Sequence, residues 1–283
     1  MNTSIIDVIV EAFSYPFFVR ALSIGGLISL AGAVLGIYVV LRKESLIGHT
    51  ISDVSFLGIA IGLALGLNMN ATTITIAVAA AIIIVALQNT GRFSHDSVLA
   101  FTAEISLAIA IVIISRLEGY RVDLLQYLFG DILGISRYDV IVATALMPFI
   151  LLTLFVTRKK VLQVTFNEEL SISAGTNIFF YNALFTVLVA VTIAIGIKIV
   201  GVILMAAFLV IPANIAKTVA RSFKEMVLLS AGTALLATLL GLMLSYVLDA
   251  PSGAMIVMSL GSMLFLAIIV KGVLGLVSRI SST

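Results

Sequence analysis

Two ionisable side chains, His49 and Asp53, lie four residues apart within residues 46–67, an otherwise apolar segment long enough to cross a bilayer. Residues at this spacing share one face of a helix, so the imidazole and the carboxylate can reach the same point. Charged groups at membrane depth are expensive to desolvate and usually mark a path for an ion or a substrate. Because nitrogen and oxygen ligands suit a divalent transition metal, the pair predicts metal binding inside the membrane.

Two ligands alone do not hold a metal tightly. A two-fold dimer that brings this segment to its axis would supply two imidazoles and two carboxylates. Ser52 and Ser55 can add weak oxygen ligands, or hydrogen bonds that orient the ligands. Glu104 is the third ionisable residue at membrane depth, and it either lines the same cavity or faces a water-filled crevice without binding metal. A purely structural His49–Asp53 pair remains the alternative at this point.

The composition is that of a membrane protein. Hydrophobic residues make up 61% of the chain, charged residues only 11%, and the mean hydropathy is +1.26, whereas a soluble domain is about half apolar and about a quarter charged. We therefore predict an all-α, polytopic helical bundle. The chain has no cysteine, so a thiolate metal site is excluded. It also lacks a phosphate loop of the GxxxxGK[ST] type, so any ATP is hydrolysed by another chain.

The apolar segments predict about nine spanning helices of about 20 residues each. A short interfacial helix over residues 1–19, with Pro16 near its end, precedes them. Only Gly196 and Lys198 separate the sixth and seventh segments, so these two could form a hairpin or one broken helix. The predicted spans are residues 21–41, 46–67, 71–88, 98–115, 138–156, 179–197, 199–216, 226–248 and 252–276.

The positions of lysine and arginine predict how these spans are oriented, because cytoplasmic loops are enriched in both residues. With the amino terminus outside and the spans alternating, most of the 16 basic residues face the cytoplasm. The bias predicts an external amino terminus and a cytoplasmic carboxyl terminus in the cell membrane. The residues placed inside are Arg42, Lys43, Arg92, Arg158, Lys159, Lys160, Lys217, Arg221, Lys224, Lys271 and Arg279.

Glycines recur at intervals of four residues in two of the predicted spans. Gly32 and Gly36 form one such pair, and Gly58, Gly62 and Gly66 form a longer series on the helix of the His/Asp pair. Small residues at this interval let helix backbones approach closely in lipid. We expect these positions to serve ordinary packing within the bundle.

Residues 158–175 form the longest polar stretch on the predicted cytoplasmic side. Three basic residues are followed by Asn167, Glu168 and Glu169, which are suited to begin a short helix because asparagine caps an amino end and carboxylates favour it. Two interpretations fit the residues: a solvated loop, or a docking helix for a cytoplasmic motor subunit.

Five stretches together resemble the permease subunits of the zinc, manganese and iron ABC importers, the ABC-3 family. The stretches are IGHTISDVSFLGIAIG (47–62), YLFGDILGIS (127–136), TFNEELSISAG (165–175), VGVILMAAFLVIPANIA (200–216) and DAPSGAMIVM (249–258). The resemblance implies that residues 1–283 form one transmembrane permease domain without a permanently bound cofactor. It implies a second permease copy, cytoplasmic ABC ATPase subunits and an extracytoplasmic metal-binding protein as partners, besides membrane lipid.

The same resemblance assigns roles to two regions. The second span would carry the metal gate, and residues 158–175 would hold the coupling helix that enters the ATPase groove, at Phe166, Asn167, Glu168, Glu169 and Leu170. The family pattern places the aspartate first and the histidine four residues later, whereas here His49 precedes Asp53. A helix keeps both groups on one face after this exchange, about 6 Å apart along its axis.

Other classes of function are compatible with parts of the sequence. A proton-coupled secondary transporter would use Asp53 and Glu104 and would need no ATPase. An intramembrane metalloenzyme is disfavoured, because the chain lacks an HExxH motif and its only other histidine, His95, falls in a cytoplasmic loop as a surface residue. We expect no nucleic-acid partner. Nitrogen and oxygen ligands accept zinc, manganese and iron alike, so the residues do not choose the metal.

Overall fold

The computed structural model describes residues 11, 13–117, 130 and 137–280, and every regular element within them is helical. Nine of these helices are long and apolar enough to cross a membrane, which confirms the predicted all-α membrane bundle. One resemblance-bearing stretch, 127–136, lies outside the described residues except for Gly130. The elements are α2 (Pro16–Leu41), α3 (Ile47–Leu65), α4 (Met69–Gln88), α5 (His95–Ser115), α7 (Arg137–Phe166), α8 (Glu168–Ser173), α9 (Ile178–Val200), α10 (Val202–Val219), α11 (Phe223–Leu248) and α12 (Ser252–Ile280).

The first span begins earlier than predicted. Pro16 occupies the first position of α2, where a helix needs no backbone N–H donor and where the fixed φ of proline is already suitable. The prediction that Pro16 lies near the end of an interfacial helix is therefore wrong. The rest of that predicted helix falls mainly on residues 1–10 and 12, outside the described residues.

The break between the sixth and seventh spans lies at Gly201, not at Gly196 and Lys198 as predicted. α9 continues to Val200, and a single residue separates it from α10. Gly201 has φ +90° and ψ 160°, a conformation that residues with a Cβ rarely adopt. Gly196 instead lies within α9 where Met205 of α10 packs against it, and an added Cβ would overlap that side chain.

The fifth predicted span, 138–156, is part of a longer helix. α7 continues through the basic residues 158–160 to Phe166, and only Asn167 separates it from α8. Lysine and arginine are good helix formers, and the sequence after Pro148 contains no glycine or proline up to this point, so nothing ends the helix at the membrane boundary. The loop interpretation of residues 158–166 is therefore wrong.

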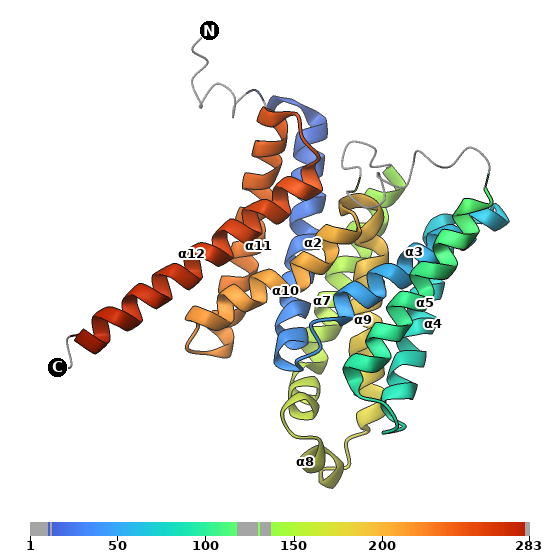
Figure 1. The fold of residues 1–283 in the computed structure, drawn as a ribbon, viewed down its shortest axis with the longest axis horizontal. Helices are drawn as coiled ribbons and strands as arrows, with labels where there is room; N and C mark the ends of the chain where they lie inside the picture. The colour runs from blue at the N-terminus through green and yellow to red at the C-terminus, as the bar shows by residue number, and fades with distance from the viewer. Residues whose placement is uncertain (1–10, 12, 118–129, 131–136, 281–283) are drawn as a thin grey trace.

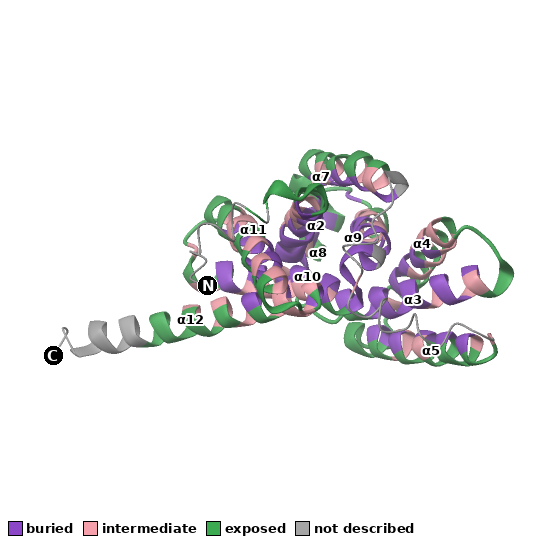
Figure 2. Ribbon diagram, turned by 90° about the horizontal axis from the view of Figure 1, so that it is seen from above, coloured by how far each residue is buried: buried purple, intermediate pink, exposed green. Residues whose placement is uncertain are grey.

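The helices that position the His/Asp pair, α3, α4 and α5, lie together on one side of the bundle (Figure 1). α3 packs against α5 and α4, and less extensively against α10 and α9. α2 packs against α10, α11 and α7, and α12 lies along α11 and α10. α2, α4, α7 and α10 have their carboxyl-terminal ends toward the end of the bundle that carries α8 (Figure 1). Seen from above, α7 lies at one edge of the bundle, and α5 and α12 lie at the opposite edge (Figure 2).

Glycines allow two pairs of these helices to approach closely, as predicted. A Cβ at Gly36 of α2 would overlap the backbone of Leu209 in α10, and one at Gly58 of α3 would come within 2.7 Å of the Cα of Thr73 in α4. Gly66 differs: it has φ +64°, ends α3, and would have nothing within 4 Å of an added Cβ. Its predicted role in packing is wrong, because it serves as a left-handed helix cap.

Candidate functional site

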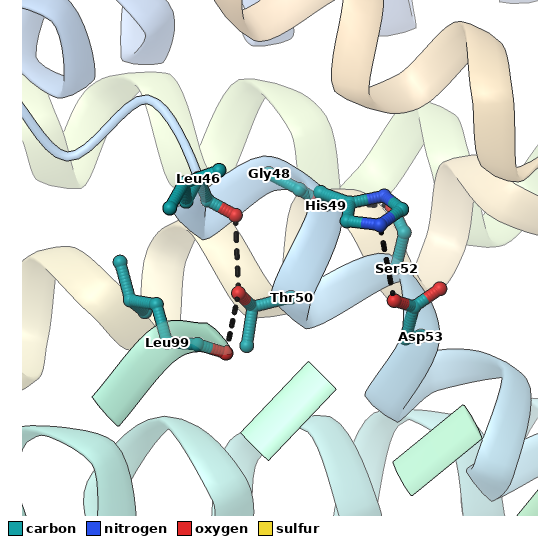
Figure 3. Close-up of polar contacts among 7 residues, drawn as sticks. All are labelled: Leu46, Gly48, His49, Thr50, Ser52, Asp53 and Leu99. Atoms are coloured by element: carbon teal, nitrogen blue, oxygen red, sulfur yellow. Dashed lines mark hydrogen bonds and ion pairs between the residues drawn. The ribbon is translucent and has the colours of Figure 1, made fainter. Parts of the chain in front are cut away.

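His49 and Asp53 point toward each other from the first two turns of α3 (Figure 3). His49 Nε2 lies 3.4 Å from Asp53 Oδ2, so the prediction that both groups share one helix face is confirmed. Their surroundings differ strongly, since the His49 side chain is 63% exposed and the Asp53 side chain only 7%. The carboxylate is therefore held inside the bundle, while the imidazole projects from the surface of the single chain.

The start of α3 is tied to its neighbour by Thr50. The Thr50 hydroxyl lies 3.1 Å from the carbonyl oxygens of both Leu46 and Leu99, the latter in α5 (Figure 3). Thr50 is buried, so this contact holds the first turn of α3 against α5. A fixed backbone at this position limits the directions that the neighbouring His49 can adopt.

The two serines suggested as additional ligands are buried inside the bundle. The Ser52 hydroxyl donates to the Gly48 carbonyl at 2.8 Å, so its proton is already used within α3. The Ser55 hydroxyl oxygen is buried and has no hydrogen-bond partner among the residues that the structure describes. Neither serine is exposed beside His49 in this conformation.

Glu104 lies on α5 and is exposed. The helix that carries it packs against α3, but no ion pair joins it to His49 or Asp53. Within the described part of the chain, no group of three or more His, Cys, Asp or Glu residues could hold a metal ion. One copy of the chain thus contributes two close ligands and a nearby negative charge.

The predicted coupling residues are at the end of the bundle where α8 protrudes (Figure 1). The Asn167 side chain accepts a hydrogen bond from the Leu170 N–H at 2.9 Å, which confirms its expected role as the cap of α8. Glu168 and Glu169 occupy the first turn. Phe166 and Leu170 are both more than 60% exposed, so the tip combines two carboxylates with uncovered apolar side chains.

Sequence reasoning missed a contact between the α8 region and the start of the α2–α3 loop. Arg42 Nε donates to the Thr165 hydroxyl at 3.1 Å, and Arg42 Cζ lies 4.3 Å from the centre of the Phe185 ring. Burial lowers the pKa of the Arg42 guanidinium, and the carboxylates of Glu44 and Glu168 act in the opposite direction. Three separate stretches of the chain therefore meet at one partly buried arginine.

A second contact reaches the same loop from α5. His95 Nδ1 lies 3.4 Å from Glu44 Oε1, and the Glu44 side chain is mostly buried while His95 is half exposed. His95 is at the surface, as predicted, but it also pairs with the loop that leads into α3. In the sequence, Arg42 and Glu44 look like ordinary charged residues after an apolar span, so no signal identified either contact.

Comparison with known proteins agrees with this architecture. The model of the ABC 3 transport family matches residues 14–271. The chain is 33% identical over 237 residues to the high-affinity zinc uptake system membrane protein ZnuB of Haemophilus influenzae, across 84% of this chain and 91% of that protein. It is 29% identical over 263 residues to the manganese transport system membrane protein MntB of Synechocystis sp., across 92% of this chain and 85% of that protein.

A solved structure has the same overall fold as this chain. A chain in the structure of PsaBC from Streptococcus pneumoniae in complex with Fab superposes with a TM-score of 0.82 at 29% identity, covering 93% of this chain and 95% of that one. The family model thus spans the described bundle from the start of α2 into α12. With nine apolar helices among its described residues and a family match over residues 14–271, the chain belongs to the ABC 3 transport family.

Proposed function

We propose that this chain is the membrane-spanning permease subunit of an ATP-driven importer of a divalent transition metal: manganese, zinc or iron. The observation that carries the proposal is the contact between an exposed imidazole and a buried carboxylate on one helix face at membrane depth. That ligand chemistry suits such a cation. The relatives named for zinc and manganese transport support the same class of substrate.

The gate is proposed to form between two copies of the chain. His49 is exposed although it lies in a spanning helix, and a two-fold axis beside it would bring two His49 and two Asp53 side chains together. Asp53 would orient the imidazole and neutralise part of the cation's charge. Glu104 would add negative potential near the path, with direct metal binding as a less favoured role. This four-ligand layer would hold a partly dehydrated cation and release it when the dimer rearranges.

The partners follow from the two ends of the bundle. Cytoplasmic ABC ATPase subunits are proposed to bind α8, where exposed Phe166 and Leu170 accompany Glu168 and Glu169. In this proposal α8 would lie in the cytoplasm, the amino terminus outside and the carboxyl terminus inside, and the distribution of basic residues supports this orientation. An extracytoplasmic metal-binding protein would deliver the cation to the opposite end. Residues 158–175 would then act as the coupling region of a single permease domain.

ATP dependence separates this proposal from its main competitor, a proton-coupled secondary transporter that uses Asp53 and Glu104. The permease would be reconstituted in liposomes with its co-expressed ATPase, and uptake of radiolabelled manganese, zinc and iron would be measured. We expect one of these metals to accumulate only when ATP reaches the ATPase, with little change after a protonophore is added. Accumulation without ATP that a protonophore abolishes would instead establish the secondary transporter.

Arg42 is proposed to transmit movement of α8 to the gate helix. It bonds the last turn of α7 through Thr165 and lies at the start of the loop that leads directly into α3. Because the guanidinium is held by a hydrogen bond and by the Phe185 ring, a shift of α8 should reach the first turn of α3, which carries His49. The contact gives the chain a short physical route between ATPase and gate.

We expect Arg42→Gln to lower ATP-driven metal uptake by about tenfold, since a hydrogen bond to a charged group contributes about 1.5–3 kcal/mol. Uptake and ATP hydrolysis would be measured in the same liposomes, and hydrolysis should persist. The matched control is Lys43→Gln, which removes one positive charge from the adjacent, exposed residue. Equal uptake by the two variants would show that Arg42 has no special part in coupling.

A further inference from the structure

A groove of about 430 Å³ opens between the later parts of α2 and α7 and the first turns of α11. Its walls are mainly apolar side chains: Val34 from α2, Leu154 and Phe155 from α7, and Val227 and Leu228 from α11. Phe155 and Leu228 are 60% and 72% exposed. Apolar residues this exposed within spanning helices face either lipid or another apolar surface.

Two cations from different helices line the same groove. Arg158 of α7 and Lys224 of α11 are both exposed, and Arg158 Cζ lies 4.2 Å from the centre of the Phe155 ring. No carboxylate among the described residues forms an ion pair with either cation. Glu225 is next to Lys224 in the chain, but its carboxylate accepts the Arg221 N–H at 2.7 Å. The two positive charges are therefore available to an anion at the mouth of an apolar groove.

The position of the groove indicates what occupies it. α7 lies at the edge of the bundle opposite α5 and α12 (Figure 2), and His49 is carried by α3, which packs on α5 rather than on α7 or α11. The groove is thus formed by helices other than those around the proposed metal gate. With the proposed orientation, both cations are at the cytoplasmic leaflet. This leaflet is rich in anionic lipids, whose head groups bind in basic pockets between spanning helices.

We propose that this groove binds an anionic phospholipid of the cytoplasmic leaflet. Its phosphate would lie between Arg158 and Lys224, and one acyl chain would fill the space between α7 and α11. The guanidinium offers a planar set of donors to phosphate, while the ammonium adds a point charge. Because α7 runs directly into α8, a lipid held here would also bridge the two helices that flank the docking end. The leaflet assignment rests on the proposed function, but the lipid-binding chemistry does not.

The test measures lipid binding by the full-length permease in detergent, using native mass spectrometry with phosphatidylglycerol and phosphatidylcholine of identical acyl chains. We expect the wild type to prefer phosphatidylglycerol by about tenfold, and Arg158→Gln/Lys224→Gln to bind both lipids alike. Val227→Trp keeps both charges but fills the groove, so it should weaken binding of phosphatidylglycerol by a similar factor. The matched control, Lys159→Gln/Lys217→Gln, removes two exposed charges that do not line the groove and should keep the wild-type preference.

Several results would overturn the proposal. One is an unchanged preference in Arg158→Gln/Lys224→Gln, and another is an equal loss in the Lys159→Gln/Lys217→Gln control, which would indicate a generally basic surface. A third is that Val227→Trp binds lipid like the wild type but no longer forms a dimer. That result would mean that the groove is a contact between two copies of the chain. Since the readout is lipid binding, a failure of the proposed metal transport would appear in the uptake assay and would leave these measurements interpretable.

Discussion

Substitution of alanine for His49, or for Asp53, is expected to lower metal uptake by about a hundredfold, because each change removes two of the four ligands from the proposed dimer gate. Loss of His49 removes the exposed nitrogen ligand. Loss of Asp53 removes a buried carboxylate 3.4 Å away that also orients the ring. Uptake of radiolabelled manganese, zinc and iron would be measured in cells that depend on this importer, with copurification of the ATPase as the measure of assembly.

Two further variants sharpen this experiment. The exchange His49→Asp/Asp53→His restores the order of the family pattern and keeps both ligands on one face, so it should retain more uptake than either single alanine variant. Ser52→Ala is the matched control on the same helix, since its hydroxyl bonds only the Gly48 carbonyl, and it should behave as the wild type. Full uptake by both alanine variants would make the pair structural and would direct attention to Glu104.

Gly36→Ala is expected to be the most damaging of the small changes in the bundle, lowering the stability of the folded protein by about 2 kcal/mol or more. The added methyl group would overlap the backbone of Leu209, so α2 and α10 would have to separate. α10 also packs against α3, where an added Cβ at Gly48 would lie 3.5 Å from the Cα of Ala206. The strain should therefore reach the helix that carries the gate.

Thermal unfolding in detergent would measure this effect, with Gly232→Ala as the control. A Cβ at Gly232 of α11 would meet nothing within 4 Å, so this change should leave stability unaltered or raise it slightly, because alanine favours a helix over glycine. If the two variants unfold at the same temperature, the close approach of α2 and α10 is not required by the fold.

Much of this architecture was predictable from residues close together in the sequence. The run of apolar segments predicted a nine-helix bundle, because a bilayer requires each span to be apolar over about 20 residues. The four-residue spacing of His49 and Asp53 placed them on one face, since helix geometry is local. The helix cap formed by Asn167 was also predictable from the sequence, because its hydrogen-bond partner, Leu170, is only three residues away.

Helix ends were less predictable, because several residues compete for the same role. Gly196 and Gly201 are both plausible ends for α9, and the chain breaks at Gly201, whereas Gly196 is needed where Met205 packs. Basic residues 158–160 suggested an end to the fifth span, but they favour a helix in water as well, so α7 continues.

Contacts between distant parts of the chain were decided only by the tertiary structure. Arg42 meets Thr165 and Phe185, and Glu44 meets His95, although nothing in the local pattern around either residue selects those partners. The same holds for the groove that brings Arg158 and Lys224 together from α7 and α11. Hydropathy and helix periodicity act along a few turns of one segment, whereas these sites depend on which helices pack side by side and at what depth.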